Sequence, residues 1–256
     1  MLLALDVGNT NVTIGAFDGA RLAGRWRLRT IKEQTADEWG ILLRNLFTLS
    51  SLDLNAVDGV IISSVVPAVD QPLEAMAERY FHRQPIFVNN KIDLGVPVLY
   101  DNPREVGADR LVNSVAALHK FGGPVVVVDL GTTINFDIVS AKGEFLGGVL
   151  CPGIGMSISG LFARTARLPM VDFREPEKLI GSNTVGSLTS GLYYGFVGMI
   201  DGILERLAAE LGPNMKSVAT GGQGHMIVKA SRWVKTYDED LTLEGLRIIW
   251  ERNVPQ

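Results

Sequence analysis

The stretch "LLALDVGNTNVTIGAF", residues 2–17, decides the fold. Its aliphatic run ends at an acid, Asp6, and a second apolar run resumes after a turn made by Gly8, Asn9 and Thr10. Two strand-like runs joined so closely predict an antiparallel hairpin. A carboxylate that ends a buried strand is costly unless a partner compensates its charge. We therefore expect Asp6 to meet a ligand, and Mg²⁺ fits because this ion is usually held by one or two carboxylates together with phosphates.

The same pattern returns in "PVVVVDLGTTINFDIVS", residues 124–140. Alignment with the opening places Asp129 under Asp6, and the glycines and threonines of the two turns also match. This self-similarity predicts two related halves, residues 1–123 and 124–256. The alternative is chance, because Asp-x-Gly after an aliphatic run is common in turns. A second strand after both copies favours the repeat.

Each turn has the composition of a phosphate-binding loop. Gly8 lets backbone approach a ligand, and Asn9, Thr10 and Asn11 add amide and hydroxyl groups around exposed backbone N–H donors. A second such loop across a cleft suits a nucleotide whose phosphates are held from both sides. The alternative for a single loop is a tight turn whose aspartate caps backbone N–H groups. The sequence contains no Walker loop and no kinase-type glycine-rich signature, so phosphoryl transfer here needs a different scaffold.

Strand-like and helix-like runs alternate along the chain, which predicts an α/β architecture. The "TADE" segment, Thr35 to Glu38, is a capping box that starts a helix. Other expected elements are strands at 59–66, 84–90 and 217–220 and helices at 73–82, 111–121, 157–168 and 187–212. The last helix is apolar on more than one face, so we expect it to pack in the core or also against a second subunit.

Composition limits the class of protein. The chain has 256 residues, 46% hydrophobic and 20% charged, with a formal net charge of −4, which is typical of a folded globular protein. The absence of a basic stripe argues against nucleic acid as a partner. We expect no membrane association and a cytoplasmic location, because the sequence has no signal-type or membrane-length apolar run. A single cysteine, Cys151, and three scattered histidines argue against zinc.

Six short motifs, in their order along the chain, resemble those of the type III pantothenate kinases. They are "DVGNTN" (6–11), "GADR" (107–110), "DLGTT" (129–133), "GGVLCPG" (147–153), "NTVGSLTSG" (183–191) and "TGG" (220–222). Each motif alone is weak, whereas the ordered set is specific and covers nearly the whole chain.

This resemblance implies a duplicated actin-like ATPase (ribonuclease H-like) fold, an α/β fold with two related halves of mixed sheets flanked by helices. It also implies a homodimer that phosphorylates pantothenate with ATP, the first step of coenzyme A biosynthesis. The expected cofactors are Mg²⁺ and a monovalent cation, K⁺ or NH₄⁺.

The resemblance also assigns residues by position. The expected ATP-binding residues are Asp6, Val7, Gly8, Asn9, Thr10, Asn11, Val12, Thr13 and Thr132. Asp6 is expected beside Mg²⁺, and Asp129 is expected to bind the monovalent cation. The expected pantothenate-binding residues are Tyr100, Gly107, Ala108, Asp109, Arg110 and Thr184.

Asp109 is the expected catalytic base. A primary alcohol must lose its proton as it attacks the γ-phosphorus, and a carboxylate within hydrogen-bond reach can accept that proton. The alternative for "GADR" is an ordinary helix start, with Asp109 favoured in the first turn by the helix dipole. Only the resemblance raises the catalytic interpretation above this alternative.

The sequence departs from the family pattern in one place. After "DLGT" the family usually continues Ala-Thr-Thr, whereas this chain has Thr133, Ile134 and Asn135. Asparagine still donates a hydrogen bond and isoleucine does not, so ligand contacts from these two positions are in question.

Two other functions fit the same fold. A non-catalytic regulator is the alternative, although the retention of Asp6, Asp109 and Asp129 favours an enzyme. An acyl-phosphate or sugar kinase also fits, because fold does not determine function; the "GADR" and "NTVGSLTSG" segments favour pantothenate.

Overall fold

A computed structural model describes residues 1–165 and 168–254. Packing divides the chain into two compact units. One contains residues 1–116 and the C-terminal segment from Asp240 onward, and the other contains residues 117–239. Within the described ranges, no helix is long and apolar enough to cross a membrane.

The first unit is built on a five-stranded sheet with the strand order β3-β2-β1-β4-β5. Its strands are β1 (Leu2–Val7), β2 (Asn11–Asp18), β3 (Arg21–Arg29), β4 (Gly59–Ser64) and β5 (Ile86–Phe87). β2 runs antiparallel to its two neighbours, β1 and β3, whereas β4 and β5 run parallel to β1. The helical segments are α1 (Ala36–Leu49), η1 (Leu54–Ala56), α2 (Pro67–Met76), η2 (Ala77–Phe81), η3 (Pro103–Glu105), the first part of α3 (Ala108–Phe121) and α7 (Leu241–Asn253).

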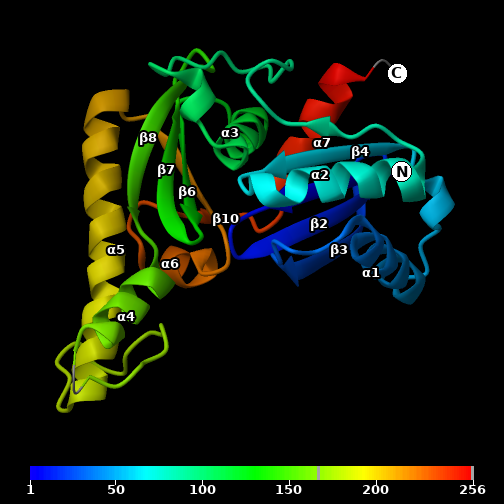
Figure 1. The fold of residues 1–256 in the computed structure, drawn as a ribbon. Coiled ribbons are helices and arrows are strands. Elements are labelled where there is room, and N and C mark those ends of the chain that lie inside the picture. Colours follow the sequence, from blue (N-terminus) through cyan, green and yellow to red (C-terminus); the bar gives the residue numbers. More distant parts are fainter. Residues whose placement is uncertain (166–167, 255–256) are drawn as a thin grey trace. The chain divides into compact units, whose positions relative to one another are not determined.

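The second unit repeats this sheet (Figure 1). Its strands are β6 (Val125–Leu130), β7 (Thr133–Val139), β8 (Phe145–Pro152), β9 (Lys216–Thr220) and β10 (Thr236–Tyr237), and its helices are α4 (Ile154–Ala163), α5 (Thr184–Leu211) and α6 (Gly224–Ala230). β6, β7 and β8 are antiparallel, and β9 and β10 run parallel to β6. Each strand therefore has a counterpart in the first unit, which confirms the predicted repeat.

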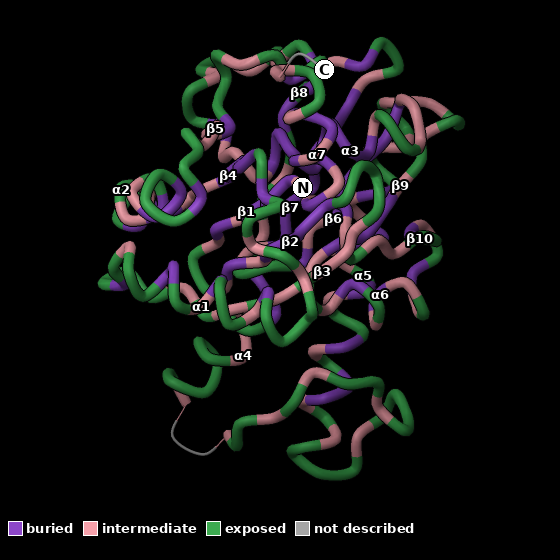
Figure 2. The backbone as a smooth tube through the Cα atoms, turned by 90° about the vertical axis from the view of Figure 1, so that its right-hand side faces the viewer, coloured by how far each residue is buried: buried purple, intermediate pink, exposed green. Residues whose placement is uncertain are grey.

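Side-chain alternation gives each sheet two different faces. In β1, Leu3, Leu5 and Val7 belong to a buried apolar cluster that also contains residues of α1 and α2. In β6, Val126 and Val128 pack in a cluster that also contains residues of α5. Figure 1 shows α5 running alongside the sheet of the second unit, and Figure 2 shows that buried segments follow the strands. Because successive side chains point to opposite faces, the acid that ends each strand lies away from this apolar layer.

Local signals predicted several element boundaries. α1 begins after Thr35, whose side chain forms the predicted capping box with Glu38. α3 ends before Gly122, which has a φ of +68°. The predicted helix 157–168 corresponds to α4, which starts three residues earlier, at Ile154; residues 166–167 of that prediction lie outside the described residues.

Other boundaries differ from the prediction. The strand predicted at 84–90 is reduced to the two residues of β5, and the helix predicted from residue 73 already begins at Pro67, because proline suits the first turn of a helix. β3 and α7 were not predicted.

The last helix, α7, packs in the first unit although it follows the second sheet in the sequence. Its buried residues include Leu243, Leu246 and Ile249, and it contacts β1, β2 and β4. The predicted half 124–256 contains this helix, so the compact units differ from the halves defined by the repeat. Gly245 lies against the backbone of α3: a Cβ added there would meet the Val112 carbonyl oxygen at 2.3 Å.

We expect Gly245→Ala to lower the stability of the first unit by about 1–3 kcal/mol. The new methyl group would clash with the Val112 backbone, which cannot move aside as a flexible side chain can. Gly202→Ala in α5 is the control, since its Cβ would lie 3.5 Å from the Arg206 side chain, an ordinary contact. This variant should be neutral or more stable, because alanine suits a helix better than glycine. Thermal denaturation of both variants tests the packing, and equal melting temperatures would contradict it.

Candidate active site

The first candidate loop lies at the end of β1. In the sheet register Asp6 stands opposite Thr13 of β2 on one side and Ser63 of β4 on the other. Directly opposite residues share a sheet face, so these three side chains form a row across the strands. The row provides one carboxylate and two hydroxyl groups at the carboxyl ends of β1 and β4, the edge where open α/β sheets bind ligands.

Backbone and side-chain hydrogen bonds hold the turn between β1 and β2. The Gly8 N–H donates to the Asn11 carbonyl at 3.0 Å. Thr30, which follows β3, donates from its hydroxyl to the Gly8 carbonyl at 2.6 Å and from its N–H to the Thr10 carbonyl at 3.0 Å. Asn9 and Thr10 remain exposed at the tip. The turn is thus anchored at both ends and open to solvent between them.

Two of the expected ATP-binding residues lie with their side chains in the core. Val7 and Val12 pair across the hairpin and are 1% and 0% exposed. Any ligand contact from these positions must therefore come from the backbone.

The second loop lies at the equivalent place in the other unit. Asp129 stands opposite Asn135 of β7 and Thr220 of β9, just as Asp6 stands between Thr13 and Ser63. The Gly131 N–H donates to the Thr133 carbonyl at 3.0 Å, and Thr132 is exposed at the tip. The predicted equivalence of the two acids therefore extends to the polar residues on their neighbouring strands.

Two glycines pack directly on this second loop. A Cβ at Gly153 would lie 2.0 Å from the Thr132 carbonyl oxygen. A Cβ at Gly221, which has a φ of +85°, would lie 2.7 Å from the Leu130 carbonyl oxygen and 2.8 Å from Asp129 Oδ1. Only glycine allows approaches this close. The "DLGTT", "GGVLCPG" and "TGG" motifs, far apart in the sequence, thus meet at one loop.

The two residues that depart most from the family pattern, Ile134 and Asn135, lie in different environments. Ile134 is fully buried in the apolar cluster of the second unit. Asn135 shares the row of Asp129, and its Oδ1 accepts a hydrogen bond from the Thr133 hydroxyl at 2.9 Å. Ile134 therefore serves packing, and Asn135 keeps a polar group beside the acid.

Asp109 lies in the first turn of α3, in the first unit. Its Oδ1 accepts a hydrogen bond from the Arg110 N–H at 2.8 Å. A Cβ at Gly107 would lie 2.6 Å from the same oxygen, so glycine leaves the room that the carboxylate occupies. Burial raises the pKa of Asp109, while the Arg110 N–H and the charge of Arg110 act in the opposite direction without cancelling the rise. The carboxylate is thus a stronger base than an ordinary aspartate.

The other expected pantothenate-binding residues are divided between the units. Tyr100 is half-buried in the first unit. Residues before and after it in the sequence, 90, 92–98 and 103, line a pocket of about 550 Å³. Thr184 is exposed at the start of α5 in the second unit and helps to line a pocket of about 560 Å³. Asn183 caps α5 there by accepting a hydrogen bond from the Gly186 N–H at 2.8 Å.

The described residues include no group of three His, Cys, Asp or Glu side chains that could hold a metal ion by themselves. A Mg²⁺ ion commonly takes one or two carboxylates and completes its coordination with waters and phosphates. The row of Asp6 with its neighbouring hydroxyls fits that kind of site. Asp129 Oδ1 and the Leu130 carbonyl oxygen, which both lie close to Gly221, provide the oxygen donors that a hard monovalent cation requires.

Motif reasoning missed the residues beside the two acids. Ser63 belongs to none of the six motifs, and Thr220 and Gly221 lie in the "TGG" motif, for which the sequence assigned no role. An alignment of the halves over all their strands, instead of over the loops alone, contains the missing signal. It would have placed the end of "GVIISS" beside Asp6 and the end of "KSVAT" beside Asp129.

Solved structures with low sequence identity share the fold. The chain matches a structure from Campylobacter jejuni, described as a conserved Baf family transcriptional activator, with a TM-score of 0.61 at 20% identity over 98% of both chains. It matches an activator of 2-hydroxyisocaproyl-CoA dehydratase from Clostridium difficile with bound ADPNP, with a TM-score of 0.55 at 9% identity over 96% of this chain and 91% of that one. Together with the repeated sheets, these matches confirm the predicted duplicated actin-like ATPase fold.

Sequence relatives are much closer. A sequence model of the type III pantothenate kinase family matches residues 2–206. A type III pantothenate kinase from Solibacter usitatus (strain Ellin6076) is 64% identical over 256 residues, which cover 100% of this chain and 98% of that protein. One from Koribacter versatilis (strain Ellin345) is 55% identical over 99% of this chain and 96% of that protein. The chain belongs to the type III pantothenate kinase family.

Proposed function

We propose that this protein transfers the γ-phosphoryl group of ATP to the primary hydroxyl of pantothenate, giving 4'-phosphopantothenate and ADP in the first step of coenzyme A biosynthesis. One observation carries the proposal beyond family membership. Asp6 and Asp129 occupy the same register position in two repeated sheets, each at the end of a strand and each followed by an exposed polar turn. Each loop of this kind suits the phosphate groups of a nucleotide.

The nucleotide contacts follow from the two turns. Asn9, Thr10 and Thr132 are exposed at the tips. Their backbone N–H groups, the Asn9 side-chain amide and the two threonine hydroxyls can donate to phosphate oxygens. The full proposed set is Asp6, Val7, Gly8, Asn9, Thr10, Asn11, Val12, Thr13 and Thr132, with Val7 and Val12 acting only through their backbone.

We place Mg²⁺ beside Asp6 and a monovalent cation, K⁺ or NH₄⁺, beside Asp129. When bound, these cations neutralise phosphate charge. The oxygen donors at each position, described above, fit hard cations. Neither acid is part of a group of three or more acidic, His or Cys side chains in the described residues, so waters and nucleotide phosphates would complete the coordination of each cation.

Pantothenate is assigned to Tyr100, Gly107, Ala108, Asp109, Arg110 and Thr184. In the reaction the hydroxyl oxygen bonds to the γ-phosphorus, and the bond from that phosphorus to the bridging oxygen of ADP breaks. The hydroxyl proton passes to the Asp109 carboxylate, whose raised pKa suits a general base. Arg110 is suited to an anionic group of either substrate, because its planar fork matches carboxylate and phosphate.

The purified protein should form 4'-phosphopantothenate from ATP and pantothenate, and added K⁺ should stimulate the reaction. Asp109→Asn should lower kcat by about 10²–10⁴-fold, the usual contribution of general base catalysis. In the wild type, kcat/KM should fall on the acid side with an apparent pKa above the ordinary aspartate value of about 4, because only the ionised base accepts the proton. No product from folded wild type, with or without K⁺, would instead support a non-catalytic regulator.

The raised pKa of Asp109 also predicts how stability depends on pH. Above that pKa the folded protein carries a charge that burial disfavours, whereas below the ordinary aspartate pKa both folded and unfolded forms are protonated. Asp109→Asn should therefore match or exceed the wild-type melting temperature at pH 7, and the difference should shrink as the pH falls to about 4.

Asp37→Asn is the matched control for this pH dependence. Hydrogen bonds from Tyr80 and Arg79 lower the pKa of the exposed Asp37 carboxylate, so its charged form favours the folded state. Loss of that charge should lower stability slightly at pH 7 and have less effect in acid. If Asp109→Asn behaved like Asp37→Asn, burial would not control the Asp109 charge.

We also propose a homodimer that uses α5 and the segments before it. The second unit exposes ten large apolar side chains between residues 146 and 194, against five in the rest of the described chain. Among them are Leu179, Ile180 and Tyr194. On α5 the exposed Gly191 and Gly195 have nothing within 4 Å of an added Cβ, so the backbone of a second subunit could approach closely.

We place the enzyme in the cytoplasm with its co-substrate ATP, and we assign it no nucleic acid or membrane partner.

Gly195→Glu should convert the dimer to a monomer, because it places a charge in this apolar surface. A Cβ at residue 195 meets no atom within 4 Å, so the fold of the subunit itself should not be disturbed. Ala209→Glu, exposed near the other end of α5, is the control and should leave the dimer intact. Light scattering after size-exclusion chromatography measures both masses. A monomeric wild type, or a dimer that survives Gly195→Glu, would contradict the assignment.

A further inference from the structure

We propose that Arg27 and Arg29 of β3 bind the terminal phosphates of the nucleotide and form a basic wall beside the first loop. The inference rests on the proposed function, since it adds residues to the same nucleotide site. Neither arginine belongs to a motif that pointed to this site, and both lie on a strand that was not predicted.

The strand register places both residues next to the loop. Arg27 stands opposite Thr13 and Arg29 stands opposite Asn11. Thr13 itself stands opposite Asp6, so Asp6, Thr13 and Arg27 form one row on one face of the sheet. Neighbouring strands are about 4.8 Å apart. The long Arg27 side chain can therefore extend past Thr13 towards Asp6 and meet a phosphate chain that reaches out from the loop.

The alternation of β3 fixes which way these arginines point. Trp26 and Leu28 pack against the apolar cluster under α1 and α2, and the Trp26 ring stacks on Phe47 with ring centroids 5.4 Å apart. Arg27, between these two residues, and Arg29, directly after Leu28, must therefore lie on the opposite face, where Asp6 lies. The bonds from Thr30 to the first turn then tie the end of β3 to the loop itself.

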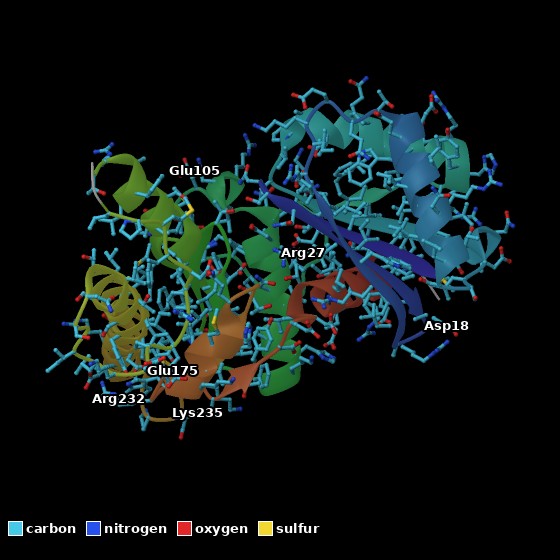
Figure 3. The ribbon with its side chains drawn as sticks, turned by 90° about the horizontal axis from the view of Figure 1, so that it is seen from below. Asp18, Arg27, Glu105, Glu175, Arg232 and Lys235 are labelled. Atoms are coloured by element: carbon cyan, nitrogen blue, oxygen red, sulfur yellow. The ribbon has the colours of Figure 1, made fainter. Side chains whose placement is uncertain are left out.

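Ion pairing separates the four arginines of β3 into two groups. Arg21 pairs with Asp18 at 3.1 Å, and Arg25 pairs with Asp240 at 2.8 Å. Arg27, labelled in Figure 3, and Arg29 are exposed and have no ion pair with any described residue. The two arginines nearest the loop are thus the two whose charge is left for another partner.

A polyphosphate fits these two guanidinium groups. Each presents several N–H donors in a planar fork that matches phosphate oxygens, and charge-assisted bonds of this kind are stronger than neutral ones. In a protein of net charge −4, two such cations beside the acid of the loop also offset the repulsion between Asp6 and an anionic ligand. The competing explanation is that charges on an edge strand only prevent sheet-to-sheet association.

The test measures binding of AMP-PNP with Mg²⁺, and of adenosine, by calorimetry. Arg27→Gln and Arg29→Gln should each weaken AMP-PNP by about tenfold or more, since a charged hydrogen bond is lost. Adenosine, which has no phosphate, should bind as to wild type. Arg27→Lys should recover part of the loss, and KM for pantothenate should stay within about twofold in all variants.

Arg21→Gln is the control, because Arg21 lies on the same strand but at the end far from the loop, where it stands opposite Asp18. It should leave both ligands unaffected. Unchanged AMP-PNP binding in both glutamine variants would overturn the inference, as would equal weakening of adenosine or a rise confined to KM for pantothenate. A wild type that binds AMP-PNP through these arginines but forms no phosphopantothenate would refute the proposed function and leave this inference standing.

Discussion

A carboxylate at the end of a buried strand constrains the rest of this structure. In β1, Leu5 and Val7 lie in the apolar layer and Asp6 lies on the opposite face between them. A slip of one residue in the β1–β2 register would move the acid into the core and the aliphatic side chains out of it. The register that buries the aliphatic side chains is therefore the same register that places the acid on the opposite face. The same holds for Asp129 in the second unit.

The two units keep this condition but support their loops differently. The first turn is held by hydrogen bonds from Thr30, which also attach the end of β3 to it. The second loop is enclosed by backbone, with Gly153 on its tip and Gly221 against Asp129. Side-chain tethering tolerates change in the surrounding residues, whereas close backbone packing admits only glycine. This difference explains why the second loop carries more recognisable glycine motifs than the first.

Sequence signals predicted those parts of the fold that depend on neighbouring residues. The hairpin, the Thr35 capping box and the end of α3 at Gly122 all follow from local patterns. β3 was missed because it contains no continuous apolar run; its signal is the alternation of Arg25, Arg27 and Arg29 with Trp26 and Leu28, which is typical of a half-buried strand. The packing of α7 in the first unit could not be predicted either, since its buried face is matched to strands formed by residues 2–64, far from α7 in the sequence. The contacts of Gly153 and Gly221 with the second loop depend on tertiary structure in the same way.

Asp109 shows why a site residue can resemble an ordinary one in the sequence. An acid in the first turn of a helix is common, because the free N–H groups and the helix dipole stabilise its charge. Those effects lower a pKa, and the Arg110 N–H contributes to them here. Burial acts in the opposite direction and prevails, so the net result is a more basic carboxylate. The helix start positions the carboxylate, and this position can be recognised in the local sequence. Burial by the surrounding protein sets its basicity, and burial cannot be read from the neighbouring residues. Gly107 is part of the local signal, because any larger residue would occupy the space of the carboxylate oxygen.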